Sequence, residues 1–533
     1  MAYDTTLLET TRPAQQPAEL PECLKRDRLN AGYFAQFTAA QLGMVIALSV
    51  IFLWTSLHKL NHTDLWGHLD FGRWIAQHRA LPAFDPFAAT PSNIPFVPNA
   101  WLSQVLGYFT IEAFGLDGLV LAHAALLTLA CGLMIAALCA RNVPLRWAVT
   151  GGATYYLLAL PIVGTIRPQL FGMVGVPLVL LAVAQLGKTR WPLVWLPITF
   201  MLWANLHGSF MMALAMLGIC AAGQTWLVFG EKRHLRATLA DVSVVRLWAA
   251  VGLAIIGASV NPLGPQLFVH VLGFGKHAAL ADISEWRSLS LTSVSFGLFA
   301  VSTIVAIVSF KFSQRRWELS DLLLLLVFGL ATISAMRMLV WWAAIWPWAV
   351  LPYAVSAWQA KFGHSNEPAA PPQAMRTVLA LGFIFMTLLI APPTNQLILG
   401  RTRGIGSVAS PDTPIYVADE IARRKLQGAF YAPMDWADYL IWQQPDGFRP
   451  LAYSHVHLLA PSVWNDFQQL SAGSKDWLRL ADAHELRYLV ISKQRNKPLA
   501  GAVLKYSGQK SSRATVLYQD QHSVLVELKP ASL

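Results

Sequence analysis

Apolar runs of about 15–22 residues recur along residues 38–392, and each is long enough to cross the hydrocarbon core of a bilayer as a helix. This feature constrains the fold more than any other. Composition agrees with it, because 55% of the 533 residues are hydrophobic and 13% are charged, against about 25% charged in soluble domains. The sequence therefore predicts a polytopic α-helical membrane protein and excludes soluble, collagen-like and disulfide-scaffold architectures.

We expect about 11 transmembrane helices from the positions of these runs. The expected ranges are 38–58, 119–140, 145–163, 169–187, 191–204, 209–229, 246–260, 291–310, 319–335, 338–357 and 375–392. Two of them, 191–204 and 246–260, cross only about 22 Å at the rise of an α-helix, so broken or re-entrant segments are an alternative there.

Lysine and arginine are concentrated in the connections that share a side with the N-terminus, and such connections face the cytoplasm. Residues 1–37 then form a cytoplasmic N-terminal tail. Residues 38–395 form the transmembrane domain, with a large first outer loop at 59–118, and residues 396–533 lie outside. The net charge of +11 fits basic cytoplasmic loops, and without a basic-aromatic motif we expect no nucleic-acid partner.

The segment after residue 400 is polar and alternates between helical and β-like patterns. Helical stretches cover 411–426 and 464–470. Short β-like runs follow at 487–492, 514–518 and 523–528. This alternation predicts a small C-terminal extracytoplasmic α/β domain.

The first outer loop opens with a helical pattern. On a helix Asp64 and His68 share a face, and Asp70 and Arg73 form an i,i+3 pair. Leucine and isoleucine side chains lie on another face. We expect an amphipathic helix on the outer membrane surface.

Unusual polar residues also stand at the outer ends of the expected spans. They are Arg167, Asn205, His207, Asn261, Glu285 and Arg337. Ionisable groups near lipid are costly and often functional, so their gathering at one level predicts a polar cavity that opens outward. The structural alternatives are lipid-facing anchors for the two arginines, a packing role for His207, and a helix stop at Asn261.

This set suits an anionic lipid-linked substrate, because arginine recognises phosphate and a carboxylate can accept the proton of an acceptor hydroxyl. We predict catalytic roles for four residues: Asp64, His68, His207 and Glu285. We predict donor-phosphate contacts from four others: Arg167, Arg337, Asn205 and Asn261. As an alternative, Asp64 and Asp70 hold a divalent metal such as Mg²⁺ or Mn²⁺.

Three sequence motifs resemble a bacterial branch of the GT-C superfamily of integral-membrane glycosyltransferases. Asp64–Ile75 fits D-x-W-x-H-L-x-x-G-x-W-I, Leu81–Phe87 reads LPAFDPF, and Trp101-Leu102 follows. The pattern Asp435–Leu440 in the tail is also familiar. The resemblance implies a polyprenyl-phosphate-linked sugar donor, a glycan, lipid or protein acceptor, hexosyl or pentosyl transfer in cell-envelope glycan biosynthesis, and a catalytic Asp in the first outer loop. It also implies a location in the bacterial inner membrane, among membrane lipids, with a periplasmic C-terminal domain.

The chain departs from the GT-C pattern in one respect. Many members carry near-adjacent acidic residues in the first loop, whereas Asp64 and Asp70 would not share a helix face. Asp85 could supply a second carboxylate if the loop folds back. No catalytic set is visible in the tail domain, so we expect it to recognise the acceptor or to cap the cavity.

Two other classes of function remain as alternatives. A transporter or flippase for a lipid-linked glycan would place polar groups near the bilayer midplane and show repeated halves, and the sequence shows neither. A non-catalytic membrane scaffold with a binding domain would not need the outer Asp, Arg and His set.

Overall fold

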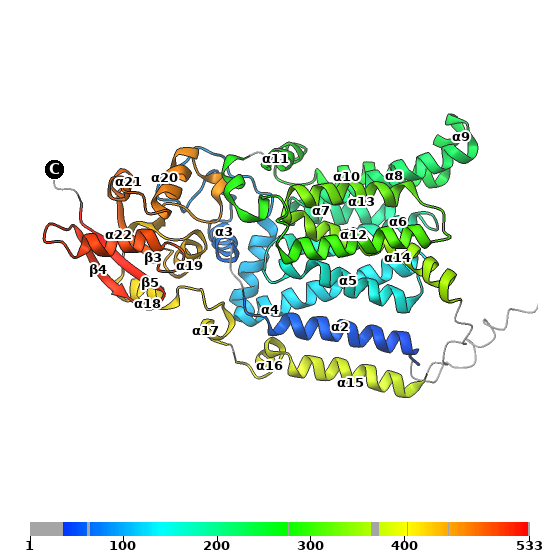
Figure 1. Ribbon diagram of the computed structural model, residues 1–533, viewed down its shortest axis with the longest axis horizontal. Coiled ribbons are helices and arrows are strands. Elements are labelled where there is room, and N and C mark those ends of the chain that lie inside the picture. The colour runs from blue at the N-terminus through cyan, green and yellow to red at the C-terminus, as the bar shows by residue number, and fades with distance from the viewer. Residues whose placement is uncertain are drawn as a thin grey trace, which may run out of the picture.

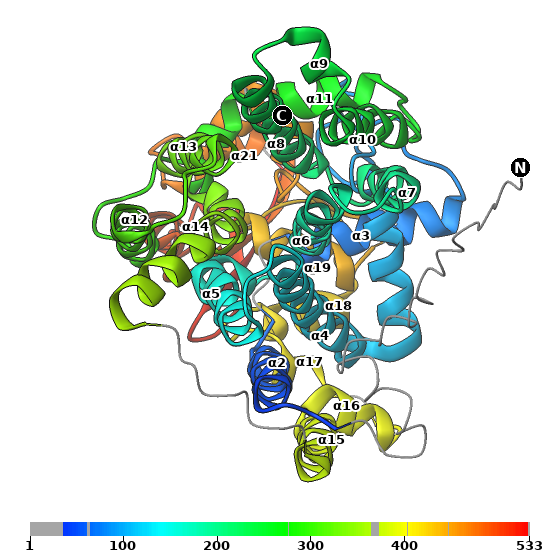
Figure 2. The same ribbon diagram turned by 90° about the vertical axis from the view of Figure 1, so that its right-hand side faces the viewer.

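The computed structural model describes residues 36–60, 64–275, 277–363, 373–401, 403–445 and 447–530. Long helices run side by side in a bundle, and a small sheet with its own helices covers one end of the bundle (Figure 1). Figure 2 shows the bundle along the helix axes. The expected cytoplasmic tail, 1–37, falls almost wholly outside the described residues.

Eleven helices of the bundle coincide with the eleven expected spans. They are α2 (Ala39–Leu57), α4 (Trp101–Ala140), α5 (Leu145–Val163), α6 (Gln169–Leu186), α7 (Pro192–Leu206), α8 (Phe210–Lys232), α10 (Val242–Ala258), α12 (Val294–Phe312), α13 (Leu319–Ser334), α14 (Leu339–Phe362) and α15 (Ala374–Ile390). By length and hydropathy six segments could cross a membrane, and α15 with α16 (Pro392–Ile398), bent by 78°, would make a seventh. The helices α7, α10 and α13 are apolar but shorter, so eleven spans remain a prediction.

Helix α14 lies at the core of the bundle, because every residue from Leu339 to Tyr353 is buried. Two of its tryptophans form hydrogen bonds there: Trp342 Nε1 donates to Ser302 Oγ at 2.9 Å and Trp346 Nε1 donates to the Ser302 carbonyl at 2.7 Å. By contrast, large apolar side chains on α12 and α15 are exposed, for example Val301 and Phe385. These outward faces are what a helix presents to lipid.

The expected first outer loop, 59–118, contains helical segments, of which the first was expected from the sequence. It contains α3 (Leu65–His78), and α4 already begins at Trp101. Gly115 breaks the helical geometry of α4 with φ 63°, and the chain turns there into the bundle (Figure 1). A positive φ is easy for glycine, which has no Cβ. The part of α4 before this turn therefore belongs to the connection, and the part after it coincides with the expected span 119–140.

The tail domain has the expected α/β character. Its strands are β1 (Gly428–Tyr431), β2 (Phe448–Pro450), β3 (Leu486–Ser492), β4 (Ala514–Gln519) and β5 (Ser523–Leu528). The strand order is β2-β1-β3-β5-β4. The pairs β1–β2 and β1–β3 are parallel, whereas β3–β5 and β4–β5 are antiparallel. The sequence predicted β3, β4 and β5, whereas β1 and β2 are too short to show a period.

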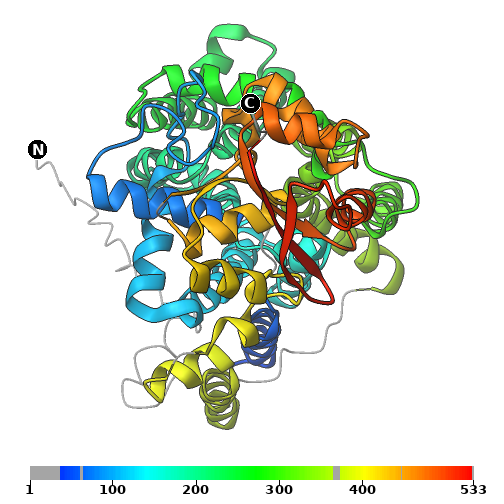
Figure 3. The same cartoon turned by 90° about the vertical axis from the view of Figure 1, so that its left-hand side faces the viewer.

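Helices α18 (Ile415–Arg424) and α20 (Pro461–Ser471) match the two predicted helical stretches. The domain also contains α19 (Met434–Gln443), α21 (Trp477–Ala483) and α22 (Lys497–Ser507). Figure 3 shows the sheet and these helices from the side away from the bundle. The remaining short elements are α9 (Leu235–Leu239), α11 (Gln266–Phe274), α17 (Ile405–Val408) and the 3-10 turns η2 (Ala278–Asp282), η3 (Ser284–Trp286), η4 (Met336–Met338) and η5 (Val456–Leu458).

Helix α3 is packed between α4 and α19, and its position along the outer membrane surface stays a prediction. Its apolar residues Trp66, Leu69 and Phe71 are almost fully buried. Trp66 meets Tyr439 of α19 with ring centroids 5.2 Å apart. The amphipathic pattern was recognised correctly, but protein covers its apolar face instead of lipid.

Candidate functional site

Four charged residues meet at the end of the bundle that faces the tail domain. Asp64 precedes α3, Arg167 lies in the turn between α5 and α6, Glu285 lies in η3, and Arg337 lies in η4. Pro168 follows Arg167, and a residue before proline is disfavoured in helical geometry. The turn therefore interrupts the two helices at Arg167.

Arg167 joins two carboxylates that are far apart in sequence. Its Nε donates to Asp64 Oδ1 at 2.8 Å, and its Nη1 and Nη2 donate to the two oxygens of Glu285 at 2.6 and 2.7 Å. The side chain is 14% exposed. Burial opposes its charge, but Asp64 and Glu285 outweigh that effect and raise the pKa of Arg167. This arrangement orients the planar guanidinium rigidly.

Arg337 is the second cation of the cluster, and its guanidinium carbon lies 4.1 Å from the centroid of the Trp286 ring. Among the described residues it makes no ion pair closer than 4.0 Å. Burial lowers the pKa of Arg337, and the charge of Glu285 partly opposes that shift. A desolvated arginine on an aromatic face has its hydrogen-bond donors available for an anion.

Two predicted histidines lie beside these charges. His68 Nε2 is 4.0 Å from Asp64 Oδ2, and Gln104 Nε2 lies 3.1 Å from His68 Nδ1. Burial lowers the pKa of His68. The ring is then neutral, and because the Gln104 amide donates to Nδ1, its proton is on Nε2, facing Asp64.

His207 ends α7, and its Nδ1 accepts a hydrogen bond from the Ser209 backbone N–H at 3.1 Å. Burial, reinforced by the positive charge of Arg337, lowers the pKa of His207 to about 3. This histidine is therefore uncharged at neutral pH. Its position fits a polar wall of the site as well as the packing role considered from the sequence.

The two predicted asparagines have their amide groups occupied by the protein. Asn205 accepts from Trp101 Nε1 at 2.8 Å and donates to the carbonyls of Met201 and Val260. Asn261 donates to the carbonyls of Ala258 and Gly264. Both shape the ends of helices, so a contact with a donor phosphate remains a prediction.

Asp70 forms an ion pair with Arg73 at 2.5 Å. Within the described ranges, no group of three or more His, Cys, Asp or Glu side chains could hold a metal ion. Among these described residues the pair Asp64 and Asp70 therefore lacks a third ligand of these types for a metal ion.

Residues of the tail domain complete this region, and the sequence did not assign them a role. The His455 ring lies 4.9 Å from the His68 ring, and among the described residues its buried Nε2 has no hydrogen-bond partner. Asp438 Oδ1 accepts from the Ser454 backbone N–H at 3.1 Å. Burial raises the pKa of Asp438 well above its usual range, and the nearby charges of Asp70 and Asp64 add to the shift. Asp438 belongs to the pattern Asp435–Leu440, and this pattern was the sequence feature that could have pointed to it. No pattern in the sequence pointed to His455.

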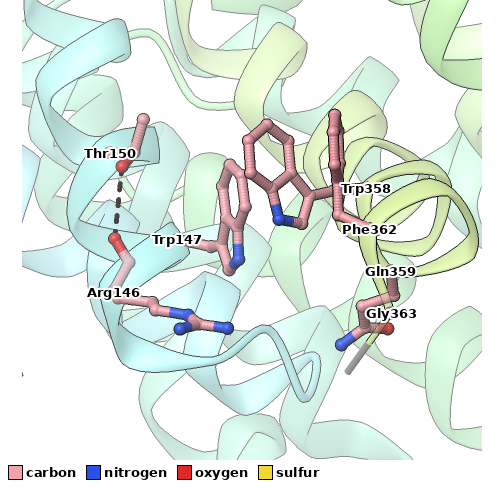
Figure 4. Close-up of a pocket in the computed structure, with 7 residues that line it drawn as sticks. All are labelled: Arg146, Trp147, Thr150, Trp358, Gln359, Phe362 and Gly363. Atoms are coloured by element: carbon pink, nitrogen blue, oxygen red, sulfur yellow. Dashed lines mark hydrogen bonds between the residues drawn. The ribbon is translucent and has the colours of Figure 1, made fainter. Parts of the chain in front are cut away.

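Two cavities lie away from this cluster. One of about 350 Å³ is at the opposite end of the bundle, where Trp147, Trp358 and Phe362 line it beside Arg146 and Gln359 (Figure 4). The other, of about 260 Å³, lies in the tail domain. The charged cluster, and not either cavity, contains the predicted site residues.

No protein-family model matches this sequence, and no curated protein matches it. Solved structures do match. The archaeal oligosaccharyltransferase AglB from Archaeoglobus fulgidus, in complex with an inhibitory peptide and a dolichol-phosphate, is similar with a TM-score of 0.53 and 14% identity. The match covers 87% of this chain and 72% of AglB. The arabinofuranosyltransferase AftD from Mycobacteria is similar with a TM-score of 0.51 and 15% identity, over 93% of this chain and 40% of AftD.

These similarities confirm, at the level of the fold, the resemblance to the GT-C superfamily. The fold that this chain shares with AglB and AftD is an apolar helical bundle with a C-terminal domain over one end (Figure 1). At such low identity the likeness establishes the fold and leaves the reaction to be argued from the site.

Proposed function

We propose that this protein is a GT-C-type membrane glycosyltransferase. It transfers a hexosyl or pentosyl group from a polyprenyl-phosphate-linked donor to a glycan, lipid or protein acceptor at the outer face of the membrane. The observation that carries the proposal is the bridge from Arg167 to Asp64 and Glu285, with Arg337 beside it, at the covered end of the bundle.

The donor phosphate would bind to Arg337 and Arg167. Arg337 has a desolvated guanidinium with no carboxylate partner among the described residues, so an anion would offset the cost of its burial. Arg167 is already oriented by two carboxylates. When the glycosidic C–O bond breaks, its electrons pass to the phosphate, and two arginines would stabilise that growing charge.

Asp64 would act as the general base. The acceptor hydroxyl oxygen attacks the anomeric carbon while Asp64 accepts the hydroxyl proton. Neutral His68, whose Nε2 faces Asp64, would hold the carboxylate in place. His207 and Glu285 would line and orient the same region, since Glu285 holds Arg167 through two hydrogen bonds.

A divalent metal at Asp64 and Asp70 remains an alternative role for these carboxylates. It has weaker support, because Asp70 is engaged by Arg73. We further propose residence in the bacterial inner membrane with a cytoplasmic N-terminus. Residues 396–533 would then form the extracytoplasmic domain. Lys/Arg asymmetry and the single-sided placement of the site support this orientation.

The test is a transfer assay on purified protein with a panel of polyprenyl-phosphate sugars, in the presence of Mg²⁺ or Mn²⁺ and in chelator. We expect turnover by the wild type and a loss of about 10²-fold or more in Asp64→Asn. The matched control is Asp476→Asn, which changes an exposed carboxylate in the tail domain and should retain activity.

Three results would contradict parts of the proposal. Full activity of Asp64→Asn would show that Asp64 is not the general base. Loss of activity in chelator would favour metal ligation by the first-loop carboxylates. Specific binding of a lipid-linked glycan without turnover of any donor would favour the transporter.

A further inference from the structure

The cavity in the tail domain lies where the sheet changes direction. Strands β1 and β3 are parallel neighbours. From β1 the chain passes through α19 to β2 at one edge, and from β3 it passes through α22 to β4 at the other edge. In open α/β sheets a crevice forms at the carboxyl ends of strands where the connections diverge in this way, and ligands bind there.

The residues that line the cavity come from this crevice. Trp436 follows β1, Ser492 and Arg495 end and follow β3, and Ser523 begins the antiparallel β5 opposite Ser492. Lys59, at the end of α2, adds a wall from the bundle. The cavity is therefore built by the tertiary fold and is not a surface irregularity of one loop.

Two buried polar groups of the lining residues, the Trp436 indole N–H and the Ser523 hydroxyl, are poorly satisfied by the described residues. Trp436 is 3% exposed and Ser523 is 2% exposed. Within the described part of the chain, Trp436 Nε1 makes no hydrogen bond, and the Asp520 carboxylate is the one group that Ser523 Oγ approaches there. Buried donors are nearly always satisfied, so a ligand that supplies acceptor atoms would remove a real cost here.

The charges of the lining favour a neutral ligand. Lys59 and Arg495 are balanced by Asp412 and Asp520. Arg495 is also held by Asp435 at 2.6 Å and approaches Asp412 at 3.5 Å. An anion would have to compete with these carboxylates, whereas hydroxyl groups can accept from the arginine and donate to the carboxylates together.

Size and an exposed aromatic side chain narrow the ligand class further. The volume of about 260 Å³ is below the range of about 300–1,000 Å³ typical of drug-sized ligands, so one small unit fits. Tyr416 also lines the cavity and is 72% exposed. A polyhydroxylated ring with one apolar face matches this combination.

We propose that the tail-domain cavity binds one neutral sugar residue of the acceptor glycan. Its hydroxyl groups would meet Trp436 Nε1, Ser523 Oγ, Arg495 and Asp412. The lining of the cavity supports a neutral sugar as the ligand. That this sugar belongs to the acceptor glycan rests on the proposed function. Helix α19 links the two sites, because Asp438, two residues after Trp436, faces Gly67 of α3 near Asp64.

The experiment measures binding of methyl glycosides to the full chain in detergent by saturation-transfer NMR. The probes are methyl α-mannopyranoside, methyl β-galactopyranoside and methyl α-arabinofuranoside, with methyl glucuronide and inorganic phosphate as anionic probes. We expect at least one neutral glycoside to bind, and its affinity to fall about 10-fold or more in Trp436→Phe and Ser523→Ala. Ser507→Ala, which removes a tail-domain hydroxyl bonded to its own helix, should bind like the wild type.

Binding that survives both cavity substitutions would overturn the proposal, as would binding of only the anionic probes or of no probe. Ser523→Ala removes only one oxygen atom. It can therefore still test the proposal if the Trp436→Phe protein does not fold. Asp64→Asn separates the two proposals. Retained sugar binding in that variant supports the cavity independently of catalysis. If no donor is turned over by the wild type, the proposed function fails while the sugar site stands.

Discussion

Arg167 is the residue on which the electrostatics of the candidate site depend. It is the shared partner of Asp64 and Glu285, which come from the start of α3 and from η3. Without it, two partly buried carboxylates would face one another with only Arg337 near enough to compensate. A planar fork that donates to both at once is a property of arginine that lysine does not share.

Replacing Arg167 with lysine tests this geometry. A single ammonium group cannot reproduce three hydrogen bonds to two carboxylates, so we expect kcat/KM for transfer to fall about 10²-fold or more. The measurement is steady-state kinetics with the donor found in the transfer assay. Arg287→Lys is the matched control, because Arg287 is exposed and bonds backbone carbonyls. Equal kinetics for wild type and Arg167→Lys would show that charge alone suffices.

Asp438 gives a prediction about pH. Burial raises the pKa of Asp438 in the folded protein above the value of about 3.9 in an unfolded chain. Its contribution to stability is therefore full below about pH 4 and is lost as the pH rises through the folded pKa. Asp438→Asn removes this titration, so its melting temperature relative to wild type should rise as the pH increases from about 4 and level off above the folded pKa.

Thermal unfolding in detergent across that pH range is the measurement. For the exposed control Asp476→Asn, the difference in melting temperature from the wild type should stay constant across this pH range. If the difference in melting temperature between Asp438→Asn and the wild type does not change with pH, this carboxyl has the same pKa in the folded and the unfolded chain.

At the scale of elements, the contact between α3 and α4 positions the first-loop residues. Gly72 lies so close to α4 that an added Cβ would be 2.1 Å from the Gln104 carbonyl oxygen. Gln104 also hydrogen-bonds His68. The glycine therefore allows two helices to approach, and their approach places a neutral histidine beside Asp64.

Gly72→Ala should force these helices apart. We expect a loss of about 1–3 kcal/mol in the free energy of unfolding, the usual cost of overpacking, and a loss of transfer activity. Gly43→Ala on α2 is the control, since nothing lies within 4 Å of its Cβ position and alanine favours a helix. Similar melting temperatures for both variants would contradict the close packing.

At the scale of the whole molecule, polar contacts join the start of the tail segment to the bundle. Arg403 Nε pairs with buried Asp117 of α4 at 2.6 Å, and the Arg403 backbone N–H donates to the same carboxylate at 2.9 Å. Leu60 forms an isolated parallel bridge with Ala409. These contacts anchor the segment that leads from the bundle into the sheet.

Asp117→Asn should loosen this anchor, because breaking a buried ion pair leaves an uncompensated charge and costs about 3–5 kcal/mol. We expect faster tryptic cleavage at Arg401 and Arg403 than in the wild type, measured by gel and mass spectrometry. Asp482→Asn, which removes a surface ion pair with Arg513, should be cleaved like the wild type. If tryptic cleavage of Asp117→Asn is as slow as that of the wild type, the Asp117–Arg403 ion pair does not hold this segment in place.

Hydropathy and pattern alone determined the helical bundle, the pairs Asp64–His68 and Asp70–Arg73, three strands, and the gathering of Arg167, Glu285 and Arg337 at one end. These are local properties, because a helix needs only its own apolar run and a charge near lipid is costly wherever it stands. Only the tertiary structure decided that Arg167 pairs with Glu285, 118 residues away. The same holds for the packing of α19 on α3 and for the contact between His455 and His68. Such contacts depend on which surfaces pack together, and no local pattern encodes that choice.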